Sequence, residues 1–416
     1  MNLLEKAAAN QLKKTGEKKK MSIRGQCNNT YDVYAIPLKY LYYNDKNGRI
    51  NTAYKKYSSI HGLLIPNAGD SEYNKIFEEF IYNSNSQAMD QTVLSFKEKA
   101  QQEPGVVLSD GRVIDGNRRL TALRIIEKEK NIPQEFNAII LPYDLKLEND
   151  EKIIKEIELD LQLGHERPVE YNPIERIFDV YNTIEVKKIM TVEEYKKASG
   201  AKNTKGINKD IRLAELILKF IEIVSPGENP IDKFYLAREL NLDGPIEEIE
   251  KHISKINSEN KEAIKEAVLV YLASNKAIDV QKDTTRIMRE LKDNVIKDNE
   301  RLEFFLNAVD DKVDEIMDLF KENPIQSASD LKTVIEKDVE VKNDMNLLLE
   351  STKKIINKGK RINERIKPLT MLEEIMEILL DIDLNDFSEL TVNEKTQARE
   401  IIKGINDCLY KIKNGI

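Results

Sequence analysis

Patterns of apolar and polar residues divide the chain into a mixed N-terminal part and a helical remainder. Apolar residues alternate with polar ones over residues 31–40, and a β-rich run over residues 136–141 ends at Pro142. Both patterns predict strands. Residues 72–100 and 148–162 instead carry apolar side chains at helical spacing. From about residue 150 onward, the pattern predicts helices without a further strand.

The segment 105–124 predicts a strand hairpin that runs directly into a helix. Two β-rich runs, Val106–Leu108 and Arg112–Ile114, flank Asp110-Gly111, a dipeptide suited to a tight hairpin turn. A second glycine turn, Asp115-Gly116-Asn117, follows at once and opens a run with helical apolar spacing. A strand therefore leads through a glycine bend into the first turn of a helix.

The first turn of this helix favours an anion site. Arg118 and Arg119 stand there, where the helix dipole disfavours positive charge unless an anion is bound. Free amides at a helix start attract anions, and Gly116 lets a ligand approach the backbone closely. The alternative is that both arginines are solvated or pair with local carboxylates. The candidate phosphate-binding residues are Asp115, Gly116, Asn117, Arg118 and Arg119.

A helix-turn-helix is predicted further along the chain. Thr191 with Glu194 forms an N-cap signature, and a short helix runs to Ser199 and Gly200. A polar turn over residues 201–206 and a second helix over residues 207–223 follow. An ordinary helical hairpin with a lysine-rich surface explains the pattern equally well. If DNA is bound, the candidate contacts are Lys202, Asn203, Thr204, Lys205, Asn208, Lys209 and Arg212.

Residues 228–416 alternate charged and apolar residues at helical periods. Breaks are predicted at 226–230, 243–245, 323–324 and Pro368. An apolar residue recurs every seven positions at Val334, Val341, Leu348, Ile355 and Ile362. A helix packed on a bundle explains this as well as a coiled-coil dimer does, and we favour the bundle. The expected divisions are a tail (1–30), an α+β domain (31–147), a helical region with the helix-turn-helix (148–225) and a helical interaction domain (228–416).

Charge and the rarer residue types narrow the functional classes. The 416 residues carry a formal net charge of −8, so DNA binding has to rest on local basic patches. The two cysteines lie far apart, and the three histidines lack zinc spacing, which argues against disulfide frameworks, zinc sites and a His-Asn-His nuclease core. We find no P-loop motif, no apolar run of membrane-span length and no signal-peptide core, so we expect a cytoplasmic protein with no membrane partner.

Three segments in order resemble the ParB N-terminal domain and its helix-turn-helix, over about residues 30–220. Residues 113–123 resemble the second box of the family, and Asn172-Pro173-Ile174-Glu175 is similar to the end of its third box. Residues 191–213 resemble the family's helix-turn-helix, with one extra residue in the turn. The resemblance to the first box of the family is weaker. The motif that ends in arginine in the family is missing here, and Arg49 lies near the position of that arginine.

This resemblance implies a ParB/sulfiredoxin-like domain that binds a nucleoside triphosphate, CTP or ATP, with Mg²⁺. In such proteins the second box holds the triphosphate, so Arg49 becomes a further candidate phosphate ligand. The acidic and amide ligands of the family's third box have no clean counterpart. Candidate Mg²⁺ ligands are Glu158, Asp160, Gln162, Glu166 and Glu175, each of which also reads as an ordinary polar group on a helix surface.

Two other groups of proteins carry a segment similar to the second box of the ParB family. Sulfiredoxin carries a reactive cysteine where Asn117 stands, which excludes thiol chemistry here. Restriction-associated proteins carry an Asp-Gly-Gln-Gln-Arg-Leu-Thr motif close to residues 115–121.

The expected function is therefore a nucleotide-binding, DNA-binding protein of plasmid or phage partition, regulation or anti-phage defence. NTPase activity is left open. We expect a homodimer, with a protein partner for residues 228–416 as an option. The alternatives are a ParB-like nuclease or phosphotransferase, and a non-catalytic helical scaffold.

Overall fold

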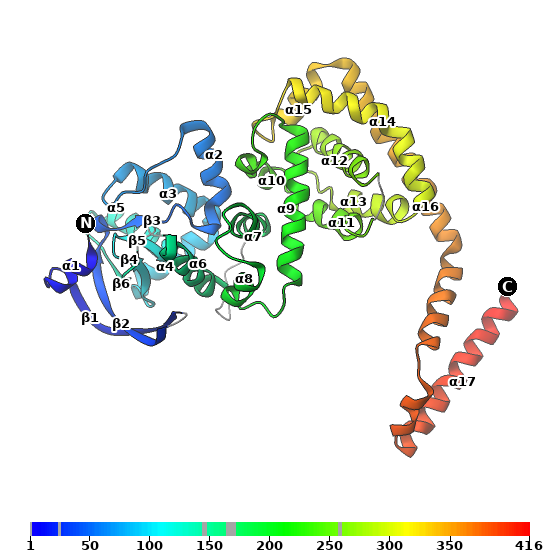
Figure 1. The fold of residues 1–416 in the computed structure, drawn as a ribbon, viewed down its shortest axis with the longest axis horizontal. Coiled ribbons are helices and arrows are strands. Elements are labelled where there is room, and N and C mark those ends of the chain that lie inside the picture. Colours follow the sequence, from blue (N-terminus) through cyan, green and yellow to red (C-terminus); the bar gives the residue numbers. More distant parts are fainter. Residues whose placement is uncertain (1, 24–25, 144–147, 164–171, 257–259) are drawn as a thin grey trace. The chain divides into compact units, whose positions relative to one another are not determined.

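A computed structural model describes residues 2–23, 26–143, 148–163, 172–256 and 260–416 (Figure 1). The chain divides into two compact units, Met1–Lys353 and Lys354–Ile416. The first unit holds one mixed sheet with its helices, followed by a helical region, as the sequence predicts for an α+β domain and a helical remainder. The second unit begins at Lys354, within the range 228–416 that the sequence assigns to a helical C-terminal domain.

Six strands form the sheet, in the order β1-β2-β6-β4-β5-β3. The hairpin predicted around Asp110-Gly111 is present: β4 pairs antiparallel with β5, and Gly111 has φ +96°. The pairs β4–β6 and β3–β5 are parallel, and the others are antiparallel. The strands are β1 (Lys13–Ile23), β2 (Gln26–Pro37), β3 (Tyr42–Tyr43), β4 (Gly105–Leu108), β5 (Arg112–Asp115) and β6 (Glu135–Leu141).

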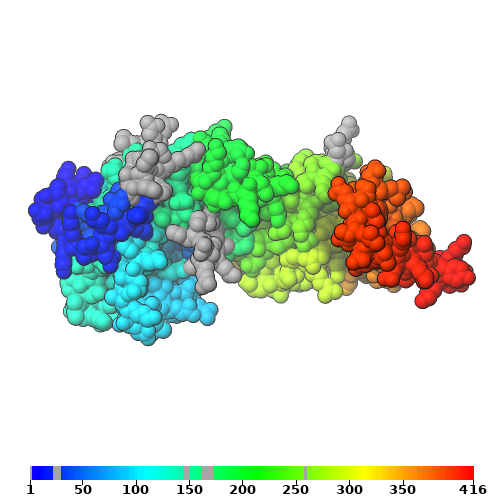
Figure 2. Space-filling view, turned by 90° about the horizontal axis from the view of Figure 1, so that it is seen from below, coloured from blue at the N-terminus to red at the C-terminus, as the bar shows by residue number. Residues whose placement is uncertain are grey.

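The predicted N-terminal tail is wrong for most of its length. Strand β1 pairs along β2, and Leu3 of the short helix α1 (Leu3–Ala8) donates its amide to the carbonyl of Ser109 at 2.7 Å. The lysines of this segment lie on β1, an outer strand, where backbone pairing needs no apolar pattern and charge discourages pairing with other chains. This N-terminal segment, dark blue in Figure 2, lies at the surface of the first unit.

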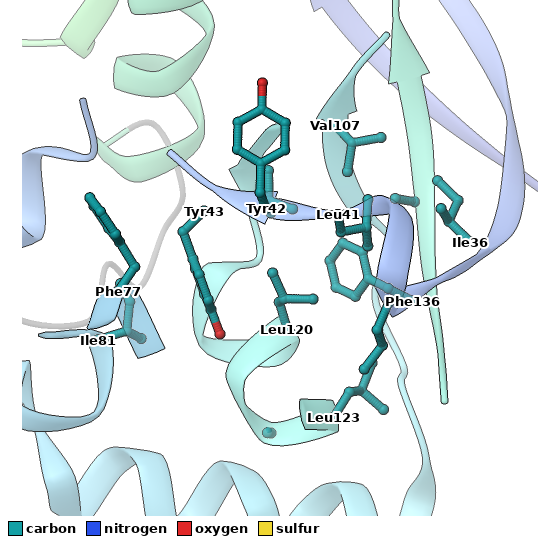
Figure 3. Close-up of a cluster of buried hydrophobic side chains, with 14 of the residues drawn as sticks. Ile36, Leu41, Tyr42, Tyr43, Phe77, Ile81, Val107, Leu120, Leu123 and Phe136 are labelled. Atoms are coloured by element: carbon teal, nitrogen blue, oxygen red, sulfur yellow. The ribbon is translucent and has the colours of Figure 1, made fainter. Parts of the chain in front are cut away.

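Helices cover both faces of the sheet. Alternate residues of β4 divide between two cores: Val107 packs with α3, α4 and α5, whereas Val106 and Leu108 pack with α6. In the first core, Leu120 of α5 lies between Tyr43 and Phe136 (Figure 3). The helices around the sheet are α2 (Asn51–His61), α3 (Ser71–Ser84), α4 (Ser86–Lys99), α5 (Asn117–Lys130) and α6 (Glu148–Leu163), with short turns η1 (Leu38–Tyr40) and η2 (Gly48–Ile50).

Helix α9 organises the helical region of the first unit (Figure 1). It packs against α7 and also against α11, α12 and α14. The elements here are α7 (Pro173–Tyr181), η3 (Asn182–Val186), α8 (Val192–Ser199), α9 (Lys205–Val224), η4 (Pro230–Lys233), α10 (Tyr235–Glu239), α11 (Asp243–Ile253), α12 (Lys261–Ile278), α13 (Thr285–Leu291), η5 (Lys292–Ile296), α14 (Asn299–Glu322) and α15 (Asp330–Lys337).

The long helix α16 (Val339–Leu380) continues through Pro368, where the sequence predicted a break. Pro368 is exposed, so water can hydrate the carbonyl that loses its backbone partner. The seven-residue apolar seam is buried at Leu348 and Ile355, as expected for a bundle, but it continues past Ile362 on an exposed part of the helix. The turn η6 (Leu384–Glu389) and α17 (Val392–Gly415) complete the chain.

A buried carboxylate joins α11 to the α13–η5 segment. Glu248 accepts hydrogen bonds from Lys292 at 2.8 Å, and from Arg289 and Lys251 at 3.1 Å each. Burial opposes ionisation of this carboxyl, but the three cationic donors outweigh burial and lower its pKa to about 2. The charged form of Glu248 is therefore favoured by the fold.

We expect Glu248→Gln to lower the free energy of unfolding at pH 7 by about 1–3 kcal/mol, the usual worth of hydrogen bonds to charged groups. A lowered pKa in the folded state stabilises the protein above the unfolded pKa of about 4.3, and this stabilisation is lost as the pH falls toward 2. Denaturation midpoints of both proteins between pH 7 and 2 should therefore converge in acid. A constant gap between the two curves would contradict this assignment.

Candidate functional site

The predicted glycine bend lies at the start of α5. Gly116 has φ +96° and ψ 19°, a left-handed conformation, and no side chain caps the amides that follow it. A Cβ at this position would lie 2.8 Å from Cζ of Phe136, which leaves no room for a larger residue. Conformation and packing both require glycine here, and they leave the helix N-terminus uncapped by side chains.

Arg119, one of the two arginines in the predicted anion site, forms its hydrogen bonds within the protein itself. Its guanidinium donates to the carbonyl of Glu103 at 2.6 Å and to the carboxylate of Asp115 at 2.8 Å. Lys19 donates to the neighbouring carbonyl of Pro104 at 2.8 Å. Arg119 and Asp115 therefore tie α5 to the start of β4, which was the alternative considered from the sequence for both arginines.

Arg118 has a different environment. Its side chain is half-buried, and within the described part of the chain it forms no hydrogen bond or ion pair. Burial lowers the pKa of Arg118, and the positive charge of Arg49 lowers it further. The structure thus brings Arg49, on η2, near Arg118 on α5, and two like charges are held in a partly desolvated place.

Asn117 completes the bend with a buried polar atom. Its side chain is 8% exposed, and its Oδ1 has no hydrogen-bond partner among the described residues. Its backbone carbonyl is satisfied, because the Thr121 hydroxyl donates to it at 3.0 Å. This buried oxygen can accept a hydrogen bond from a water or from a ligand donor.

Two of the predicted metal ligands, Glu158 and Glu175, have other partners within the described residues. Glu158 is 3.5 Å from Nζ of Lys155 and accepts from the Gly48 amide at 3.4 Å. Glu175 accepts from the Thr52 amide at 3.1 Å and from Arg238 at 2.7 Å. Asp160 is exposed, the side chain of Gln162 is not described, and Glu166 lies outside the described residues.

Burial raises the pKa of both Glu158 and Glu175, and their cationic neighbours oppose this effect. Among the described residues, no group of three or more His, Cys, Asp or Glu side chains could hold a metal ion. Both glutamates therefore act in the fold as anchors: Glu158 joins α6 to η2, and Glu175 joins α7 to α2 and α10.

A cavity of about 610 Å³ opens beside η2, and it was not predicted from the sequence. Its wall includes Lys46 and Asn51, which flank η2 in the chain, together with Lys155 and Glu158 from α6 and Asp179 from α7. Three of its lysines already have acidic partners: Lys46 with Glu151, Lys55 with Asp232, and Lys155 with Asp179. No local motif predicts this cavity, because its residues come from segments far apart in the sequence.

Arg112 is a second buried charge that the sequence did not single out. It lies in β5, 8% exposed, and pairs with Asp45 while its guanidinium stacks 5.2 Å from the ring centre of Tyr42. This pair fixes the loop before η2 against the sheet, and so helps to position Arg49.

The predicted helix-turn-helix has its expected local structure. Thr191 and Glu194 form a capping box, Gly200 ends α8 with φ +69°, and α9 begins at Lys205. The candidate DNA contacts separate into two groups. Lys202, Asn203, Lys205 and Asn208 are exposed and Thr204 is half-buried, whereas Lys209 and Arg212 pair with Glu247 and Glu250 of α11 at 2.7 and 2.6 Å.

Comparison of the chain with protein-family models, curated proteins and solved structures finds no match. None of the helices in the described ranges has the length and apolar content that crossing a membrane requires. The functional interpretation therefore rests on the site itself.

The two arginines should respond differently to truncation. We expect Arg119→Ala to lower the free energy of unfolding by about 1–3 kcal/mol, because it removes hydrogen bonds of a charged group. Arg118→Ala should change it by less than about 0.5 kcal/mol, because it removes no internal partner. Denaturant titration of both variants measures the difference. An equal loss for the two variants would mean that Arg118 is a structural residue too.

Proposed function

We propose that the N-terminal domain is ParB-like and binds a nucleoside triphosphate through its phosphates at the Gly116 bend. The observation that carries this proposal is Arg118: a half-buried guanidinium beside Arg49, at an uncapped helix N-terminus, without an acidic partner in the described part of the chain. Two guanidiniums and free amides form an arrangement that stabilises multiply charged phosphate groups. The unpaired Oδ1 of Asn117 adds a nearby acceptor for a ligand donor or a water.

We assign the nucleoside part of the ligand to the cavity beside η2, whose wall contains neither Arg49 nor Arg118. Arg49 lies between Lys46 and Asn51 in the chain, and both of these line the cavity. Its volume of about 610 Å³ falls in the range usual for small-molecule sites. We place the phosphates at Arg118 and Arg49 and assign the sugar and base to the cavity.

Neither Arg119 nor a protein-bound metal takes part in this proposal. Arg119 is held by Asp115 and by carbonyl oxygens, so its role is to brace the bend. Glu158 and Glu175 contact cations and backbone amides, so we assign neither of them to Mg²⁺ in this proposal. Phosphate charge is instead balanced by arginine, and we assign no hydrolytic step.

DNA binding is the second part of the proposal. The exposed Lys202 lies in the turn after Gly200, and the exposed Lys205 is the first residue of α9, where a helix-turn-helix presents its second helix to the duplex. Because Lys209 and Arg212 are engaged by α11, we assign the phosphate-backbone contacts to the turn and the first residue of α9.

A bound nucleotide should raise the thermal stability of the protein. At a ligand concentration a hundredfold above the dissociation constant, stabilisation is about 2.7 kcal/mol, which thermal-shift measurements detect readily. We expect a shift with at least one of CTP, ATP, GTP and UTP, and a smaller one with inorganic tripolyphosphate, which lacks the base. Arg118→Ala should abolish both shifts.

Arg119→Ala serves as the matched control for this experiment. It should melt at a lower temperature than the parent protein but keep its nucleotide-induced shift. A loss of the shift in Arg119→Ala with its retention in Arg118→Ala would reverse the assignment. No shift with any of the five compounds would refute nucleotide binding.

The helix-turn-helix proposal predicts a specific salt dependence. For a random-sequence DNA duplex, Lys202→Glu with Lys205→Glu should weaken binding and reduce the slope of log affinity against log salt by about 2, roughly 0.9 for each lost phosphate contact. Lys209→Ala should leave this slope unchanged, because Lys209 forms an ion pair with Glu247 and we assign it no contact with DNA phosphate. Fluorescence anisotropy at several salt concentrations gives both slopes, and equal slopes for parent and double variant would contradict the proposal.

A further inference from the structure

The second unit carries an unusual division of charge along α16. Residues 354–367 contain six basic residues and one acidic residue, whereas residues 368–383 contain five acidic residues and no basic one. Arg361 and Arg365 lie one helical turn apart in the basic block, and Glu373 and Glu377 do so in the acidic block. Within the described residues of this unit, these four side chains form no ion pair.

An apolar stripe runs through both blocks on one face of the helix. Its residues are Ile362, Ile366, Leu369, Met376 and Leu380, separated by intervals of four and three residues or their sum. Leu369 is 59% exposed, Met376 58% and Leu380 76%. Exposed apolar stripes of this kind mark interaction surfaces, and a helix without tertiary packing is marginally stable in water.

We infer that this part of α16 is a self-association surface, on which a second copy of the chain packs its own α16 in the antiparallel direction. Antiparallel packing brings the basic block of each copy against the acidic block of the other, while the apolar stripes face each other. Parallel packing would instead set basic against basic and acidic against acidic. The charge order therefore selects the partner and its direction.

Other occupants match this surface less completely. Duplex DNA would satisfy the basic block but would repel the acidic block and leave the apolar stripe uncovered. Helix α17 has basic and acidic residues interspersed along its length, so it offers neither block a counterpart. None of its side chains is buried, and it too is open to packing in the assembled dimer.

Charge reversal with rescue tests both the partner and the direction. Sedimentation velocity of the full chain should show a dimer that dissociates on dilution. Arg361→Glu with Arg365→Glu should raise the dimer dissociation constant at least about tenfold, because acidic residues then face acidic residues. Glu373→Lys with Glu377→Lys should do the same with basic residues.

All four substitutions in one chain should restore the dimer, because antiparallel packing again pairs opposite charges. Lys395→Glu with Arg399→Glu, on α17, is the matched charge control and should leave the dissociation constant within about threefold of the parent value. Circular dichroism should show the same helix content in every variant.

A monomer at all concentrations would overturn the inference, as would a dimer unaffected by either reversal. Failure of the four-substitution chain to recover would exclude the antiparallel arrangement. A monomeric parent chain that loses DNA affinity on Arg361→Glu with Arg365→Glu would assign the basic block to nucleic acid instead.

Discussion

The arrangement of the N-terminal domain depends on the bend at Gly116 beneath Phe136. A side chain at this position would collide with the Phe136 ring, and the positive φ is one that other residues rarely adopt. This bend turns β5 into α5, which packs Leu120 and Leu123 into the main core of the domain (Figure 3). The ion pair between Asp115 and Arg119 also stabilises the bend. The core packing of α5 and this ion pair together fix the position of Arg118.

Ion pairs inside the fold give several of the charged candidates a structural role. Glu158, Glu175, Lys209 and Arg212 each join one helix to another segment of the chain. In a chain with a third of its residues charged, such pairs are common connections between helices, and they resemble functional clusters when only the sequence is known. Arg118 differs because the described part of the chain gives it a positive neighbour and no acid.

Nucleotide binding and self-association are separate proposals that rest on different parts of the chain. The first concerns η2, α5 and the adjoining cavity, and the second concerns α16 beyond residue 353. If both hold, the protein combines a ligand-binding domain with a dimerisation helix, and the predicted helix-turn-helix, α8 and α9, lies between them in sequence. Each part can be tested without the other.

Local sequence determined the elements that need only neighbouring residues. The hairpin at Asp110-Gly111, the glycine bend before α5, and the capped helix α8 all follow from turn and capping preferences that act over a few positions. Tertiary structure decided the rest. Strand β1 forms because β2 offers backbone partners to a lysine-rich segment, and Arg119 is a brace because the chain places Glu103 and Asp115 beside it. The residues that pair with β1 and the carbonyl that binds Arg119 lie many positions away in the sequence. A local sequence pattern therefore does not predict these contacts.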